Sequence, residues 1–367
     1  MLKINKPEIK VEGSTAYLKC LVESNQKTDY LWYAVDAAYT EHLVDERADG
    51  FLLALLPYAM KHGEDIEVLC PISERLHYNI KHYVTTILHH ISPQYSQCEI
   101  AAAKLDSGQL FSTNENVATG ISGGIDSFCV VADHHYDESI QPSYKLTHLL
   151  YNNVGSHGRG GKELFNARFQ KIHTISNEIG LPIIRVDSNV REFTDIRYQT
   201  CHSIVNASSP LILQKLFGKF LYASGLSYPD CFVGETNDIA YADPSLVHLL
   251  STENLQSIST GSQYTRTKKT DIISELPATY KYLDVCVSNT HQNGNCSTCR
   301  KCFRTLFTLE LLGKIERYKD VFDLEKYQAS KRRYLKKVRQ AKDPLNREIL
   351  KLAREKNYRF PWSSLIY

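Results

Sequence analysis

Residues 118–132 constrain the fold of this chain more than any other stretch. They begin with a short apolar run, turn at Ser122-Gly123-Gly124, and resume as an apolar, helix-compatible segment over residues 125–135. This order predicts a strand, a tight turn and the start of a helix. Two adjacent glycines let the backbone turn with its N–H groups on one side, and the helix adds its positive end. The turn is therefore expected to bind anions such as phosphate.

Ser122, Gly123, Gly124 and Ser127 are the candidates for phosphate contacts, through backbone N–H groups and hydroxyls. Asp126 would repel a bare phosphate, so it is expected to act through a divalent cation. The alternative interpretation is an ordinary strand-to-helix turn of an α/β protein.

From residue 116 onward, strand-like and helix-length segments alternate. Strands are expected at residues 145–153, 180–187 and 230–236, and helices at Lys162–Ile179 and over residues 209–224. Such alternation predicts an α/β fold with a parallel sheet and helices on both faces. Ligands bind beyond the carboxyl ends of such strands, at loops near Ser122, Asn152, Asp187 and Glu235. The candidate ligand contacts at this rim are Asp187, Glu235, Thr236, Asn237, Asp243, His157, Arg159 and Lys162.

The rest of the chain suggests further parts. Residues 1–115 contain several short strands and helices, including an apolar helix at residues 49–62 that Pro57 should kink, and form an α+β domain of unknown role. Residues 116–285 form the nucleotide domain and residues 286–312 a cysteine knuckle. A helical, charged tail follows over residues 313–367.

Arg266 and Lys269 lie three residues apart at an expected helix start. This spacing places both on one face, where they could reach a triphosphate. The alternative is a solvated basic face.

Four cysteines have the spacing C-x9-C-x2-C-x2-C: Cys286, Cys296, Cys299 and Cys302. Four thiolates complete a closed tetrahedral site, which predicts a structural Zn²⁺. The basic neighbours Arg300, Lys301 and Arg304 would offset its charge. An iron–sulfur cluster and a redox relay are the alternatives, and His291 could replace one ligand.

The string Ser-Gly-Gly-Ile-Asp-Ser resembles the signature of the PP-loop ATP pyrophosphatase superfamily. The cysteine pattern that follows is similar to the zinc site of 7-cyano-7-deazaguanine synthase (QueC-like) proteins, and Lys269-Thr-Asp-Ile fits a segment that these proteins have before their cysteines. The likeness covers residues 116–312. The family's substrate segment appears here only as Tyr241-Ala-Asp-Pro-Ser-Leu, and residues 1–115 are extra, so the resemblance implies the ATP chemistry rather than the deazaguanine substrate.

The resemblance implies an enzyme with ATP, Mg²⁺ and Zn²⁺ as cofactors. ATP would bind at Ser122, Gly123, Gly124, Asp126, Ser127 and Asp187, with Asp126, Ser127, Arg266 and Lys269 as catalytic residues. The enzyme would adenylate a carboxyl, carbonyl or amide oxygen of a small-molecule, peptide or protein acceptor, release pyrophosphate, and introduce nitrogen. Ammonia or a sulfur donor would arrive free or from a partner protein, and a homo-oligomer is compatible with the sequence.

Two alternative functions stay open. The first is sulfur transfer, which needs a reactive thiol outside the zinc set, with Cys129, Cys201 and Cys231 as candidates. The second is a sensor or assembly subunit that binds ATP without turnover.

The net charge and the hydropathy of the sequence bear on whether the chain binds nucleic acid or membranes. With 43 Lys and Arg against 41 Asp and Glu, the net charge of +2 gives no general case for nucleic acid. No apolar run approaches the ~20 residues of a membrane helix, and the first residues lack a signal core, so the chain is expected in the cytoplasm. The basic run at residues 331–342 indicates a solvated helix, with RNA or an acidic partner as the alternative.

Overall fold

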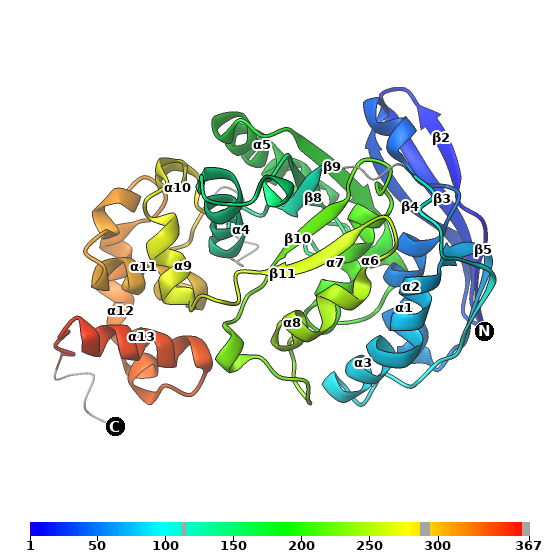
Figure 1. Cartoon of the computed structure of the whole chain (residues 1–367). Coiled ribbons are helices and arrows are strands. Elements are labelled where there is room, and N and C mark those ends of the chain that lie inside the picture. Colours follow the sequence, from blue (N-terminus) through cyan, green and yellow to red (C-terminus); the bar gives the residue numbers. More distant parts are fainter. Residues whose placement is uncertain (112–114, 287–293, 362–367) are drawn as a thin grey trace.

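A computed structural model describes residues 1–111, 115–286 and 294–361 of the chain (Figure 1). Its centre is an 11-stranded, mostly parallel sheet with the order β11-β10-β7-β8-β9-β4-β3-β1-β5-β6, and β2 pairs with β3. Helices flank this sheet. The α/β fold class predicted from the alternation of segments is therefore confirmed.

Five parallel strands form one half of the sheet: β7 (Val117–Gly120), β8 (His148–Asn152), β9 (Ile183–Ser188), β10 (Lys219–Ala223) and β11 (Gln256–Thr260). From β9 to β11 their spatial order in chain numbering is 3-2-1-4-5, the arrangement of a doubly wound sheet. The order reverses between β7 and β10. Ligands of such sheets bind in the crevice beyond the carboxyl ends of these two strands.

Both faces of the parallel strands are covered. Val117 and Leu149 pack into one core with α4 (Ile125–Val131) and α5 (Lys162–Ile179). Their neighbours Ala118 and Leu150 pack into a second core with α1 (Asp49–His62) and α7 (His202–Leu211). Because successive strand residues face opposite sides, this division places helices on both faces, as predicted.

The N-terminal residues extend the same sheet. They supply β1 (Leu2–Ile4), β2 (Glu8–Glu12), β3 (Thr15–Glu23), β4 (Thr28–Asp36), β5 (Ile66–Ser73) and β6 (Ile100–Asp106), together with α1, α2 (Glu74–Asn79) and α3 (Thr85–Ile91). β4 runs antiparallel to β9, where Tyr33 pairs with Ser188 and Ala34 with Asp187. The division of the chain at residue 115 stays a prediction.

Two expected elements are wrong. Residues 230–236 form no strand, and the predicted helix at 209–224 is instead the end of α7 followed by β10. Apolar residues lie on both sides of Gly218, and this similarity hides the change from helix to strand there. Pro57 lies inside α1, which continues to His62.

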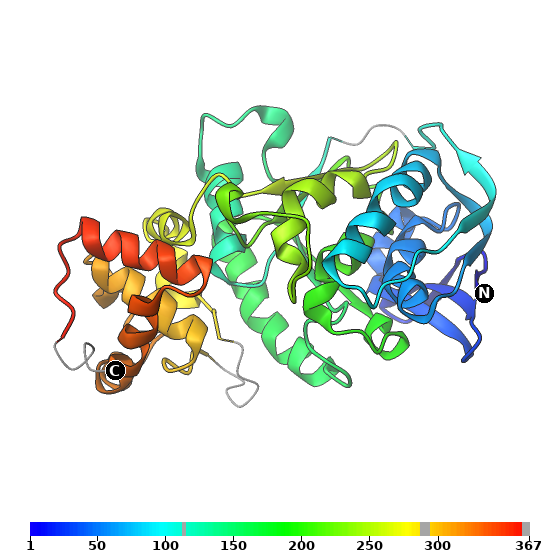
Figure 2. The ribbon, with the colours of Figure 1, turned by 90° about the horizontal axis from the view of Figure 1, so that it is seen from below.

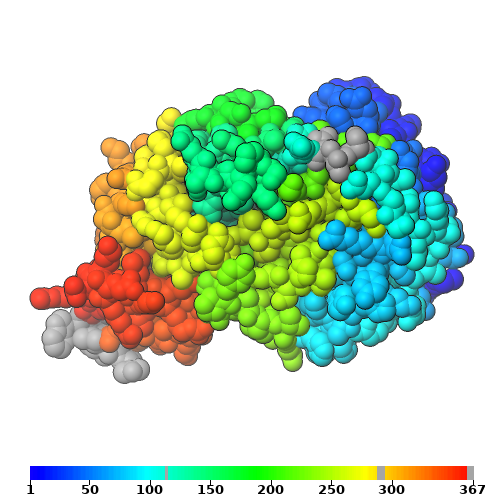
Figure 3. All heavy atoms as spheres, viewed as in Figure 1, coloured from blue at the N-terminus to red at the C-terminus, as the bar shows by residue number. Residues whose placement is uncertain are grey.

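The C-terminal helices lie at the opposite end of the molecule from the N-terminal strands (Figures 1 and 2). The C-terminal helices are α9 (Arg266–Ile273), α10 (Pro277–Tyr282), α11 (Arg300–Leu311), α12 (Leu324–Gln340) and α13 (Pro344–Glu355). Two short helices, α6 (Val190–Phe193) and α8 (Asp243–Leu246), precede them in the sequence. In the space-filling view, the middle of the chain, in green, lies between these two ends (Figure 3). Within the described ranges, no helix has the length and apolar character needed to cross a membrane.

The close approach of α1 to α7 gives a first prediction. A Cβ at Gly50 would lie 2.8 Å from Ile212 Cγ2 and 3.0 Å from the Ser208 carbonyl oxygen. We expect Gly50→Val to lower the free energy of unfolding in urea by roughly 1–3 kcal/mol, because a well-packed core has no room for the side chain. Gly108→Val is the control, since a Cβ there meets only Asp106 Oδ1 at 3.6 Å. Equal stability of the two variants would contradict this packing.

Candidate functional site

The predicted strand, turn and helix are present around residues 122–127, a segment named the phosphate loop after the ligand expected there. β7 ends at Gly120, Gly124 precedes the first residue of α4, and the helix continues as a π-helical turn over Ala132–Tyr136. Gly123 has a φ of +73°, in the left-handed region that favours glycine. Its position also faces the side chain of Ile172, which a Cβ would approach to 3.5 Å.

Hydroxyl groups hold the turn together. Ser127 Oγ donates to the Gly124 carbonyl oxygen over 3.0 Å. The backbone N–H of Gly124 donates to Ser122 Oγ at 3.3 Å, and that of Ser122 donates to Ser127 Oγ at 3.4 Å. Both N–H contacts are long, so they are weak bonds that a better acceptor would replace.

Asp126 is the point where the loop meets α9. Its Oδ2 lies 2.9 Å from Arg266 Nη1 and its Oδ1 lies 3.1 Å from Lys269 Nζ. Thr265 caps α9 by accepting from Lys268 N, which places Arg266 and Lys269 on successive turns facing the loop. The prediction that these two cations share one face agrees with this geometry.

The surroundings of Asp126 favour its charged form. Burial raises the pKa of Asp126, but Arg266 and Lys269 outweigh burial and hold it below the ordinary value. Only 1% of the Lys269 side chain is exposed, and Lys269 Nζ also donates to the Ser224 carbonyl oxygen at 2.5 Å. Ser224 directly follows β10, so the ion pair lies at the switch point between β7 and β10.

A carboxylate from α13 holds the start of α9 from the other side. Glu348 Oε2 accepts from the backbone N–H of Arg266 at 2.6 Å and from that of Thr267 at 3.4 Å. Burial raises the pKa of Glu348 above its ordinary value, and these two donors offset only part of that increase. Sequence analysis missed this residue, because its contact spans 82 positions and no local pattern marks it.

A pocket of about 460 Å³ lies beside the loop, a volume typical of small-molecule sites. Its lining includes Ser122, Gly124, Asp126, Ser127, Arg266, the end of β8, part of α5, and Tyr198, Tyr222, Asp284, Cys286 and Lys301. Four cationic side chains, Arg168, Lys171, Arg266 and Lys301, face two carboxylates, Asp126 and Asp284. The lining therefore suits an anionic ligand.

Arg168, Lys171 and Asp284 are pocket residues that sequence reasoning missed, and Lys301 was expected only to offset thiolate charge. The i,i+3 spacing of Arg168 and Lys171 on α5 is a signal that could have been used. It was hidden because α5 carries many other polar residues.

Other rim candidates lie outside the pocket lining. The Asp187 carboxylate is buried and accepts from Asn153 Nδ2 at 2.7 Å and from Ser188 N at 2.9 Å. The remaining candidates outside the lining are Arg159, Lys162, Glu235, Thr236, Asn237 and Asp243. His157 does line the pocket, and burial lowers its pKa to about 4, which leaves the ring neutral at physiological pH.

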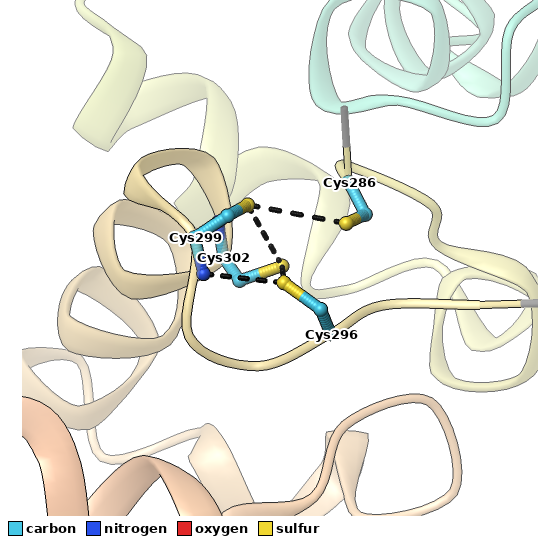
Figure 4. A group of neighbouring side chains, drawn as sticks. All are labelled: Cys286, Cys296, Cys299 and Cys302. Carbon is cyan, nitrogen blue, oxygen red and sulfur yellow. Dashed lines mark hydrogen bonds between the residues drawn. The ribbon is translucent and has the colours of Figure 1, made fainter. Parts of the chain in front are cut away.

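The four cysteines converge (Figure 4). Their Sγ atoms all lie within 4.8 Å of one another, with separations of 3.5 Å for Cys299–Cys302 and 3.9 Å for Cys286–Cys299 and Cys296–Cys302. Zn–S bonds of about 2.3 Å in a tetrahedron require sulfur atoms roughly 3.8 Å apart. The donor set therefore fits a four-coordinate metal ion such as zinc. His291 lies outside the described residues.

Local structure presents the thiols to one point. Ser297 takes a φ of 61°, which closes the knuckle between Cys296 and Cys299. The backbone N–H of Cys299 donates to Cys296 Sγ at 3.2 Å, and that of Cys302 to Cys299 Sγ at 3.5 Å. Cys299 is the N-cap of α11, so the helix directs its positive end at the sulfur atoms.

Asp284 connects the cysteine site to the phosphate loop. Its backbone N–H donates to the Gly123 carbonyl oxygen at 2.8 Å, and its Oδ1 accepts from Cys286 N at 3.3 Å. Cys286 itself lines the pocket. A metal ion that fixes Cys286 would thereby fix one wall of the pocket.

The three thiols considered for sulfur transfer do not line the pocket. Burial raises the pKa of Cys129 and of Cys201 to about 12 and that of Cys231 to about 11. These environments disfavour a thiolate.

We expect purified protein to hold about one zinc ion per chain, and Cys296→Ser to lose it. Loss of the metal should also lower Tm by several degrees, because binding energy at a closed zinc site is folding energy. Elemental analysis and thermal unfolding measure both, and Cys98→Ser is the control for a cysteine outside the site. Full zinc content in Cys296→Ser, or iron with visible absorption in the wild type, would contradict the zinc assignment.

A third prediction concerns Asp243, which accepts from Ser203 Oγ at 2.5 Å and from Ser224 Oγ at 3.3 Å. Burial raises its pKa from 3.8 to about 7. Between these values the folded chain keeps a proton that the unfolded chain has lost, so its contribution to stability falls as pH rises. The loss is roughly 1.4 kcal/mol for each pH unit in that window.

Asp243→Asn removes this titration, so its free energy of unfolding should fall less between pH 4 and pH 7 than that of the wild type. Urea unfolding at several pH values measures the slope, with the exposed Asp320→Asn as control. Identical slopes for wild type and Asp243→Asn would show that Asp243 is already ionised throughout this range.

The structure thus brings together a phosphate-loop turn, two cations on its aspartate, a cationic pocket and four converging thiols. Comparison with family models, curated proteins and solved structures finds no match for this chain.

Proposed function

We propose that the chain is an ATP-dependent enzyme of the PP-loop type. It adenylates a carboxyl, carbonyl or amide oxygen of an acceptor, releases pyrophosphate, and replaces the adenylate with a nitrogen nucleophile. The observation that carries the proposal is the pairing of Asp126 with both Arg266 and Lys269 at the switch point of the sheet, beside a cationic pocket. The Ser-Gly-Gly-Ile-Asp-Ser string and the four-cysteine pattern support it independently of each other.

The loop supplies the phosphate contacts in this proposal. The backbone N–H groups of Ser122 and Gly124 exchange their long bonds to hydroxyls for bonds to phosphate oxygens. Ser122 and Ser127 hydroxyls then turn to the same ligand. Preorganised donors of this kind stabilise charge that develops on a leaving group without reorganising at the moment of reaction.

The two cations on Asp126 have different tasks. Lys269 is buried and tied to both Asp126 and Ser224, so it holds the loop to the end of β10. The Arg266 side chain is 18% exposed, and its buried Nε lacks a hydrogen-bond partner within the described structure. Arg266 is therefore the cation that turns toward the phosphates.

Mg²⁺, bound with ATP, supplies positive charge to the leaving pyrophosphate. Asp126 and Asp284 are the carboxylates that line the described pocket, so they are the residues that would hold it. An acceptor oxygen attacks the α-phosphorus, and pyrophosphate leaves with the electrons of the broken P–O bond. Orientation of the reactants beside the loop contributes most of the rate in such a transfer.

Nitrogen is preferred over sulfur as the nucleophile. The non-zinc thiols proposed for sulfur transfer have raised pKa values and do not line the pocket. The zinc site, whose closed donor set leaves no open position, stabilises the pocket wall through Asp284.

The proposal predicts that α-³²P-ATP is converted to AMP and pyrophosphate in the presence of Mg²⁺, ammonium and a small-molecule fraction of cell extract as acceptor. Asp126→Ala should lower this conversion at least 100-fold, because Arg266 and Lys269 lose the group that positions them. Asp133→Asn, two turns along the same helical segment and outside the pocket lining, is the matched control. ADP as product, or binding of ATP without cleavage, would refute the adenylation chemistry and favour the sensor.

A further inference from the structure

Three hydrogen-bonded side chains connect the pocket to the surface. Tyr222, on β10, lines the pocket, and its hydroxyl lies 2.8 Å from His202 Nδ1. The other ring nitrogen of His202, Nε2, lies 3.0 Å from Asp238 Oδ1. The Asp238 side chain is 47% exposed, whereas that of His202 is only 18% exposed. A partly buried histidine therefore connects a pocket hydroxyl to a solvent-exposed carboxylate.

The donors and acceptors among these three side chains follow from the charge of the carboxylate. An ionised carboxylate only accepts, so His202 Nε2 carries a proton toward Asp238. In the neutral ring, Nδ1 is then the acceptor, and the Tyr222 hydroxyl donates to it. The Tyr222 oxygen keeps a lone pair for a donor in the pocket. Asp238 thus fixes the tautomer that makes His202 a base for the tyrosine.

The surroundings of these three side chains keep Asp238 ionised and Tyr222 protonated. Burial raises the pKa of Asp238, but the bond to His202 outweighs it and holds the carboxyl below its usual range. Burial and the nearby Asp243 raise the pKa of Tyr222 well above the ordinary value, so the hydroxyl stays protonated and can relay a proton. Ser224, two residues after Tyr222, accepts a hydrogen bond from Lys269 through its carbonyl oxygen. Tyr222 therefore lies close to the end of the pocket where the phosphates are proposed to bind.

We propose that Tyr222, His202 and Asp238 form a proton relay that deprotonates the nitrogen nucleophile when it attacks the adenylate. This role rests on the adenylation proposed above. The N–C bond forms as the C–O bond to AMP breaks, and AMP leaves with that electron pair. The proton of the nucleophile, ammonia or an amine, passes to Tyr222 Oη, and the tyrosine's own proton passes to His202 Nδ1. The imidazolium is stabilised by Asp238 and returns its proton to water. Tyr222 is the catalytic residue, and His202 and Asp238 are positioning residues.

The relay acts only when the nucleophile displaces AMP, so it can be tested separately from adenylate formation. Rapid-quench assays with Mg²⁺ and the small-molecule fraction of cell extract follow the two half-reactions with two labels. γ-³²P-ATP reports pyrophosphate release in the first turnover, and α-³²P-ATP reports AMP release once ammonium is added. In Tyr222→Phe, we expect first-turnover pyrophosphate release within about twofold of wild type and ammonium-dependent AMP release lowered about 100-fold or more. Tyr95→Phe is the control, because Tyr95 is buried, bonds to Thr200 through its hydroxyl and does not line the pocket.

Three outcomes would overturn the relay: unchanged AMP release in Tyr222→Phe, an equal fall in both half-reactions, or absence of pyrophosphate release in the wild type. Only the last also refutes the proposed function. An independent measurement needs no substrate. In full-length protein with ¹⁵N-labelled histidine rings, the signal lost in His202→Gln should belong to the Nε2–H tautomer and shift in Tyr222→Phe. An Nδ1–H tautomer would overturn the relay whatever the reaction.

Discussion

A carboxylate shared by two cations holds the centre of this structure together. Asp126 belongs to the helix after β7, while Lys269 comes 143 positions later and is almost fully buried. Burying a lysine without a partner would cost several kcal/mol, so Lys269 requires Asp126 and the Ser224 carbonyl oxygen. Loss of Asp126 would leave Lys269 as an unpaired charge in the interior. The phosphate loop, the end of β10 and α9 therefore form one unit.

A second set of contacts fixes the part of the pocket lining that contains Asp284. Asp284 binds the Gly123 carbonyl oxygen and precedes Cys286, the first of the four thiols. On the far side of α9, Glu348 binds the backbone at the helix start. The pocket thus depends on segments that join only in the folded chain, and a metal ion bound at the cysteines would stabilise this part of the lining as well as the knuckle itself.

Sequence predicted the parts of the site whose signal is local. The Gly-Gly turn requires a left-handed φ, the three-residue spacing of Arg266 and Lys269 fixes a shared face, and x2 gaps bring cysteines together. β10 was missed because hydropathy alone does not separate a short buried strand from the end of a buried helix. Asp284 and Glu348 act through contacts across the chain, which leave no periodic pattern.

Asp187 shows why a residue at a predicted strand end need not line the pocket. β9 ends at Ser188, one residue past the predicted end, at the same edge of the sheet as the phosphate loop. However, β4 pairs with β9 at this position, and Ser188 Oγ donates to the Trp32 carbonyl oxygen. Asn189 also bonds to β4, because its Oδ1 accepts from Trp32 N and its Nδ2 donates to the Tyr30 carbonyl oxygen. The end of β9 therefore serves to attach the N-terminal strands. The added strands shift the available crevice toward β7 and β10, where the order of strands reverses and where the charged side chains gather.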